Sequence, residues 1–364
     1  MLLPYSSELE ISNLSRLFDK MSESYKIFWF RAILDKVAAG KTRLTYDELI
    51  NQMIADAWYM VSEYKLNLGP SDTLEAAVHH VHQISGLKSS EKKETILKFL
   101  ENCRDKELLK KKRTLTEQVP YRLQAPFIEA IKGNDWKGPK QLLAERINYE
   151  KRLMYYFVQI SGLSSQIEMQ DDWARYLQEN QQIIRGWIQY NLIEYLQRRN
   201  PSVPGIVNKL YPPQERKLEK VKKYWRAITE VKPLREIYGF EPLSKTNLSI
   251  DHFVPWSYVA HDELWNLHPT TKGINSSKNN NLPDWKTYFS RFCGLEFYSY
   301  QLIWKYDKIH VEFEKCQKEH LNSTEALRLY ARGHNEAEFT RQLEDLVQPV
   351  YQSAQKMGFG RWTL

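Results

Sequence analysis

The chain has 364 residues, a formal net charge of +7 and a hydrophobic fraction of 42%. A disordered chain is excluded, because such chains are too poor in apolar residues to bury a core, and the length allows two or three domains. No run of 18 apolar residues occurs, and the first residues lack the basic and apolar stretches of a secretion signal, so we expect a cytoplasmic protein without membrane association. The modest positive charge permits nucleic-acid binding.

The three cysteines, Cys103, Cys293 and Cys316, lie far apart and form no CxxC pair. This spacing favours neither a disulfide scaffold nor a structural zinc site.

The first third of the chain has the apolar spacing of helices. Helical spacing runs from Asn13 to Ala39 and stops at Gly40. Thr45 with Glu48 three residues later predicts the start of a second helix, and Asp72 with Glu75 predicts a third, which ends before Gly86. The aromatic-rich stripes of these helices are typical of a core.

Helical patterning resumes around Phe127, runs through Phe157 and continues from Trp173 to Leu196. Four prolines then fall within 13 residues, at positions 201, 204, 212 and 213, and helices do not continue through such a density. We place the main boundary there. Residues 1–210 are predicted to form an all-α regulatory or partner-binding region, and residues 211–364 a second domain.

The stretch from Glu215 to Arg226 carries six basic and two acidic residues. It is either a helix that contacts nucleic-acid phosphates or a solvated helix face. The candidate nucleic-acid contacts are Arg216, Lys217, Lys220, Lys222 and Lys223.

A polar constellation follows in the last third of the chain. Leu248–Ile250 predicts a short strand with Asp251 and His252 at its end, and residues 264–268 predict a second strand. Asn275, Lys278 and Asn279 then fall on one face of a short predicted helix.

The residue types in this constellation suit phosphodiester hydrolysis. Aspartate and asparagine offer oxygen ligands, which favour Mg²⁺ or Mn²⁺ over Zn²⁺. A histidine beside the aspartate can take a proton from water near neutral pH.

The run Asp-His-Phe-Val-Pro-Trp-Ser at 251–257 resembles the HNH nucleases, and most of all the HNH domain of RNA-guided CRISPR nucleases. The spacings agree as well, with 14 residues from His252 to Asn266 and 9 more to Asn275. The resemblance covers about residues 235–290 and implies a ββα-metal core. It further implies that Asp251 and Asn275 hold the metal, that His252 is the general base, and that Asn266 braces the loop carrying His252.

Three further positions remain open. Asn279 is either a second helix ligand or a helix-surface or phosphate contact, and His268 is either a packing residue or a phosphate contact. Lys278 belongs to the Asn275–Lys278 run that is typical of the family and is an additional candidate.

The sequence therefore predicts a mainly α protein: a large helical N-terminal region, then a small ββα-metal HNH module with C-terminal helices. The predicted function is a metal-dependent endonuclease acting on double-stranded DNA, as an effector of bacterial anti-phage defence or restriction. The alternatives are an RNase or nuclease toxin with the same site, or an adaptor with a silent HNH fold. A partner protein or self-assembly through the helical region is expected to limit the activity.

Overall fold

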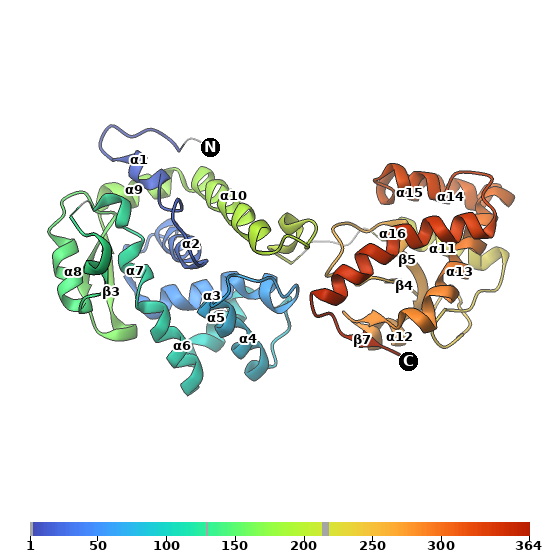
Figure 1. Cartoon of the computed structure of the whole chain (residues 1–364), viewed down its shortest axis with the longest axis horizontal. Helices are drawn as coiled ribbons and strands as arrows, with labels where there is room; N and C mark the ends of the chain where they lie inside the picture. Colours follow the sequence, from blue (N-terminus) through green and yellow to red (C-terminus); the bar gives the residue numbers. More distant parts are fainter. Residues whose placement is uncertain (1–2, 129, 213–217) are drawn as a thin grey trace. The chain divides into compact units, whose positions relative to one another are not determined.

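The computed structural model describes residues 3–128, 130–212 and 218–364. The chain forms two compact units, Met1–Pro201 with Lys209–Pro212 and Ser202–Asn208 with Pro213–Leu364. Most described residues are helical, as Figure 1 shows, which confirms the prediction of a mainly α fold. Throughout the three described ranges, no helix is long and apolar enough to cross a bilayer.

The helices of the first unit are α1 (Ile11–Ser15), α2 (Tyr25–Ala38), α3 (Tyr46–Ser62), α4 (Thr73–Ser85), α5 (Lys93–Asn102), α6 (Lys106–Thr116), α7 (Val119–Arg122), α8 (Lys140–Asn148), α9 (Asp171–Glu179) and α10 (Gln181–Arg199). Its strands β1 (Arg43–Thr45), β2 (Tyr155–Gln159) and β3 (Gln166–Met169) form an antiparallel sheet in the order β1-β3-β2.

Helix α3 is the central element of the first unit. It is buried almost along its whole length and packs against α2, α4 and α5. The hydroxyl of Thr45 accepts a hydrogen bond from the Glu48 N–H at 3.3 Å, so the helix begins where the sequence predicts. The buried carboxylate of Asp56 on α3 is paired with Arg31 at 3.4 Å and Lys93 at 2.5 Å, which compensates for its loss of water.

Two predictions for this unit were wrong. The helical run expected from Asn13 to Ala39 is interrupted, because the chain leaves the helix after Ser15 and resumes it only at Tyr25. Residues 155–157, expected to be helical, lie in strand β2, so the region is not all-α. Tyr155 and Phe157 are buried on one face of this strand, and apolar residues two apart suit a strand as well as a helix.

The second unit contains α11 (Glu219–Val231), β4 (Leu248–His252), β5 (Leu267–Thr271), α12 (Lys272–Lys278), β6 (Leu282–Pro283), α13 (Trp285–Lys305), α14 (Asp307–His320), α15 (Thr324–Leu329), α16 (Glu336–Lys356) and β7 (Arg361–Trp362). β4 and β5 form an antiparallel pair, and β6 pairs in parallel with β7. Helix α11 packs on both strands of the hairpin and on α14.

A single apolar cluster joins the hairpin of the second unit to its helices. Phe253, directly after β4, stacks on Phe292 of α13 with ring centroids 4.4 Å apart. The indole N–H of Trp225 on α11 donates to the carbonyl of Leu267 at 3.2 Å. These contacts fix the position of the hairpin, from which the polar constellation projects.

The hairpin differs from its prediction in two details. Residues 264–266 form a 3₁₀ turn, so the second strand begins at Leu267 rather than at Leu264. Asn279 lies beyond α12 with a positive φ of 48°, so it does not share the helix face of Asn275. With φ 48° and ψ −134°, the Asn279 backbone lies outside the α-helical region, so the helix ends there.

Candidate active site

Asp251 and His252 end the first strand of the hairpin. Asp251 lies opposite His268 across the β4–β5 pair, and His252 lies opposite Leu267. The hydroxyl of Thr271 accepts a hydrogen bond from the Ile274 N–H at 3.4 Å, so α12 starts directly after β5. Because helix and hairpin are joined without a linker, the side chains of α12 are held beside the end of β4.

The Asp251 carboxylate is 4% exposed and is held from two sides. The Tyr238 hydroxyl donates to its Oδ2 at 3.1 Å. The Lys278 ammonium, at the end of α12, lies 3.2 Å from both carboxylate oxygens and also donates to the His252 carbonyl at 2.8 Å. Burial, together with the negative charge of Asp251, raises the pKa of Tyr238 well above its usual value, so this phenol remains a donor. The carboxylate is therefore fixed and electrostatically balanced.

Tyr238 is itself positioned by a buried carboxylate. Glu236 is fully buried, and its oxygens accept the backbone N–H groups of Tyr238, Gly239 and Glu241 at 2.6, 2.6 and 2.9 Å. Several short bonds to one carboxylate hold the loop 236–241 in a single conformation. This loop presents the Tyr238 hydroxyl to Asp251.

Asn275 is oriented by its own hydrogen bonds. Its Nδ2 lies 2.9 Å from the Ile250 carbonyl oxygen and 3.0 Å from the Ser249 hydroxyl. A carbonyl oxygen only accepts, so the amide atom facing it must be the nitrogen. The Oδ1 of Asn275 consequently points away from this contact and is available as an oxygen ligand.

His252 forms a close pair with an acidic residue that sequence reasoning missed. Its Nε2 lies 2.7 Å from Oδ1 of Asp262, and the two side chains are 5% and 20% exposed. A carboxylate accepts, so this bond places the proton of the neutral imidazole on Nε2 and leaves the lone pair on Nδ1. Within the described ranges of the chain, no group is hydrogen-bonded to that Nδ1. The ring is thus arranged to take up a proton at Nδ1.

The loop that carries Asp262 is anchored to the end of α14. The Nδ1–H of His320 donates to the Asp262 carbonyl at 2.6 Å. The next residue, Glu263, accepts the side-chain amide of Asn322 at 2.7 Å. The C-terminal helices therefore hold the partner of His252 in place.

Asn266 does not reach the polar surface. It is fully buried, and its amide forms two hydrogen bonds with the backbone of Val254, accepting from N–H at 2.7 Å and donating to C=O at 2.9 Å. These bonds clamp the loop that leaves His252. Its place in the structure is that of a positioning residue.

Of the other sequence candidates, His268 is fully buried, and its Nε2 lies 3.8 Å from Oδ2 of Asp251. Burial lowers the pKa of His268 to about 3, so the ring is neutral. It contacts the rings of Tyr238, Phe253 and Phe292. Its surroundings are those of a packing residue.

Asp251, His252, Asn275, Lys278 and Asn279 line one hollow of about 360 Å³. Exposed Lys272, at the start of α12, lines it as well. Residues 3–128, 130–212 and 218–364 include no cluster of three or more His, Cys, Asp or Glu side chains that could hold a metal ion. Asp251 and Asn275 offer one carboxylate and one amide oxygen, a donor set that suits an ion retaining several waters.

Lys220, Lys222 and Lys223, predicted to contact nucleic acid, do not line this hollow. Arg216 and Lys217 lie outside the described residues. On α11, Lys220 is paired with Glu319 at 2.5 Å and Lys222 with Glu219 at 3.0 Å. Lys223 is exposed.

Sequence reasoning missed Asp262, Tyr238 and Lys272. Asp262 lies ten residues after His252 in a loop, and no periodicity links the two positions. Tyr238 reaches Asp251 only because the chain turns back through the loop 236–241. Lys272 could have been inferred from its position one turn before Asn275 on a helix that begins at a polar residue.

Part of the chain matches a known family. Residues 236–284 match the model of a family described as HNH endonuclease. The matched segment contains Tyr238, Asp251, His252 and Asn275, and also the loop with Asp262. This match does not distinguish the RNA-guided nucleases from other HNH endonucleases. No curated protein and no solved structure matches the chain.

Proposed function

We propose that this chain, in which residues 236–284 form an HNH endonuclease segment, is a divalent-metal-dependent endonuclease that hydrolyses phosphodiester bonds of DNA. The HNH segment indicates nuclease activity. The observation that carries the proposal is the hollow at the end of β4, where the Asp251 and Asn275 oxygens lie beside a histidine oriented by Asp262.

Asp251 and Asn275 would hold the metal ion, either Mg²⁺ or Mn²⁺. Both offer oxygen, and the amide of Asn275 is turned so that its oxygen is free of the β4 backbone. Each carboxylate oxygen of Asp251 has two lone pairs, so its bonds to Tyr238 and Lys278 leave acceptor capacity. When bound, the ion would stabilise negative charge on the scissile phosphate and the leaving oxygen.

The protein's own residues would activate the water. His252 takes the proton of the attacking water at Nδ1, while Asp262 keeps the other proton on Nε2 and stabilises the positive charge that develops on the ring. Asn266 holds the backbone at Val254, and Lys278 holds the His252 carbonyl, so the ring stays directed at the hollow. In this mechanism His252 is the general base, and Asp262, Asn266 and Lys278 are positioning residues.

Substrate contacts would come from the cations around the hollow. Lys272 is exposed on its rim and is suited to a phosphate beside the cleaved bond. Lys223 on α11, together with Arg216, Lys217, Lys220 and Lys222, would add phosphate contacts further along a DNA duplex. The net charge of +7 agrees with a polyanionic substrate.

We further propose a role in bacterial anti-phage defence or restriction, in the cytoplasm, with residues 1–210 as a regulatory region. The helical region has a large hydrophobic core of its own, so it is a folded unit and more than a linker. The residues proposed for the nuclease chemistry lie in the second unit. It would bind a partner protein or mediate self-assembly, and the isolated chain would then be weakly active. The mass of the particle in solution and the cleavage rate of the full chain test this together.

The decisive experiment incubates the purified chain with plasmid DNA and Mg²⁺ or Mn²⁺. We expect cleavage that EDTA abolishes and that His252→Ala lowers by roughly 10²–10⁴-fold. His261→Ala is the matched control, because His261 is an exposed histidine in the segment that follows β4. Cleavage of RNA in preference to DNA would favour an RNase. No cleavage of either, with any partner or metal, would favour a silent adaptor, and wild-type rates in His252→Ala would refute the assigned base.

A further inference from the structure

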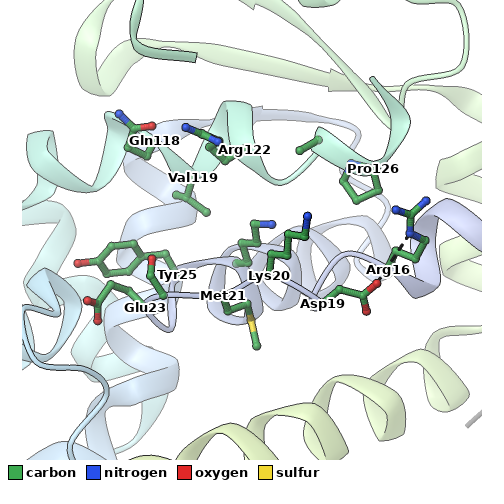
Figure 2. A pocket seen from close by; sticks show the side chains of 13 residues that line it. Arg16, Asp19, Lys20, Met21, Glu23, Tyr25, Gln118, Val119, Arg122 and Pro126 are labelled. Carbon is green, nitrogen blue, oxygen red and sulfur yellow. Dashed lines mark ion pairs between the residues drawn. The ribbon is translucent and has the colours of Figure 1, made fainter. Parts of the chain in front are cut away.

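The first unit contains a cleft of about 510 Å³ that the nuclease chemistry does not use. One wall is formed by residues 16–26, between α1 and the start of α2, and the other by α7 and the residues that follow it. Figure 2 shows Lys20 on the first wall pointing toward the second wall, which carries Val119, Arg122 and Pro126. The volume lies within the range of about 300–1,000 Å³ that is usual for small-molecule sites.

Three of the basic side chains that line this cleft have no acidic partner among the described residues. In the part of the chain that the structure describes, none of Lys20, Lys26 and Arg122 forms an ion pair with a carboxylate. The Lys26 ammonium donates to the backbone carbonyl of Leu17 at 3.3 Å. The Arg122 guanidinium lies over the Trp136 ring, 5.0 Å from its centroid, which orients it without neutralising it.

Lys26 is within range of the positive charges of Arg122 and Lys20. Burial lowers the pKa of Lys26, the positive charges of Arg122 and Lys20 lower it further, and only Asp19 opposes the shift. Asp19 is already 3.8 Å from Arg16. An anion in the cleft would offset the positive charge around Lys26, because opposite charges attract more strongly in a partly buried site than in bulk water.

The remaining surface of the cleft is suited to an organic group. Met21, Val119, Ala125 and Pro126 present apolar side chains beside the cations. The other carboxylate of the lining belongs to Glu23, and burial, with the charge of Asp72 beside it, raises its pKa. The cleft therefore combines a cationic side with an apolar side.

We propose that this cleft binds a small organic phosphate of nucleoside-phosphate size, with its phosphate held by Lys20, Lys26 and Arg122 and its organic part against Met21, Val119 and Pro126. A guanidinium fork and two ammonium groups match the several oxygens of a phosphate better than the two of a carboxylate. This site is independent of the nuclease chemistry and does not depend on the proposed function.

Calorimetry on the full chain tests the proposal, with His252→Ala as the background so that no nucleic acid is cut. The probes are ADP, AMP, pyrophosphate, adenosine and a short single-stranded oligonucleotide, at matched ionic strength because surface charges are screened by salt. We expect ADP to bind more tightly than adenosine, and Lys26→Gln or Arg122→Gln to weaken ADP binding about 10-fold or more.

Two exposed cations of the same unit provide matched controls, Lys98→Gln on α5 and Arg113→Gln on α6, and both should bind ADP like the parent. Lys20→Gln gives a variant at an exposed position, so it remains informative if the partly buried substitutions unfold the unit. No ADP binding at millimolar concentration, equal weakening by control and cleft variants, or binding of the oligonucleotide alone would each overturn the proposal.

Discussion

The pair formed by His252 and Asp262 gives the sharpest prediction about catalysis. The two atoms lie 2.7 Å apart and both side chains are largely buried, so the bond is charge-assisted and shielded from water. Such a bond contributes about 1.5–3 kcal/mol, against about 0.5–1.5 kcal/mol for a neutral one. If this energy orients the ring in the transition state, Asp262→Ala should lower kcat by about 10–150-fold, at about 1.4 kcal/mol per factor of ten.

Asp262→Asn removes the charge and keeps one acceptor oxygen, so with that oxygen facing Nε2 its loss of kcat should be smaller, about 5–12-fold. The assay is plasmid nicking at saturating Mg²⁺, with kcat and KM separated, since a positioning residue should change kcat and leave KM for DNA near its original value.

Glu263→Gln is the matched control. Glu263 is the neighbouring acid, and it contacts Asn322 instead of His252. Wild-type kcat in both Asp262 variants would refute the reasoning. An equal loss in Glu263→Gln would show that the integrity of the loop matters and that the Asp262 charge does not.

Three further predictions concern metal, fold and pH. Asp251→Asn should raise the Mg²⁺ concentration for half-maximal cleavage at least about tenfold, since it removes the charged ligand; an unchanged Mg²⁺ titration would exclude Asp251 as a ligand. Asn266→Ala leaves the buried N–H and C=O of Val254 unpaired, so urea unfolding should show a loss of about 2–5 kcal/mol; a loss below this range would mean that water replaces the amide. Burial raises the pKa of the Glu296 carboxyl well above 4.5, so above pH 4.5 the folded state keeps a proton that the unfolded state releases. The free energy of unfolding therefore falls as pH rises above 4.5, by up to about 1.4 kcal/mol per pH unit. Glu296→Gln should lack this slope in urea titrations, and an identical slope would show that the group is ionised in the fold.

Some features of the chain could be predicted because their causes are local. Asp72 accepts the backbone N–H groups of Leu74 and Glu75, and Gly86 ends α4 with a φ of 66°, so the residues at the two ends determine that helix. Residues 248–252 form a strand, as their alternation predicts.

The β2 strand could not be predicted in this way. Its partner β3 is separated from it by a turn, and β1 lies more than a hundred residues earlier. Strand identity is set by such pairing partners, whereas apolar residues at 155 and 157 are compatible with either structure.

The same distinction applies to the candidate site. By itself, the sequence placed Asp251, His252, Asn266 and Asn275 in one short segment, because residue types and spacings within 25 positions are visible along the chain. The tertiary structure alone decided that Asp262 faces His252 and that Tyr238 faces Asp251. The Asp262 loop depends on His320, the last residue of α14, and on Asn322 just beyond it, and the Tyr238 loop depends on buried Glu236. The orientation of a loop follows from what anchors it, and for Asp262 those anchors lie nearly sixty residues away.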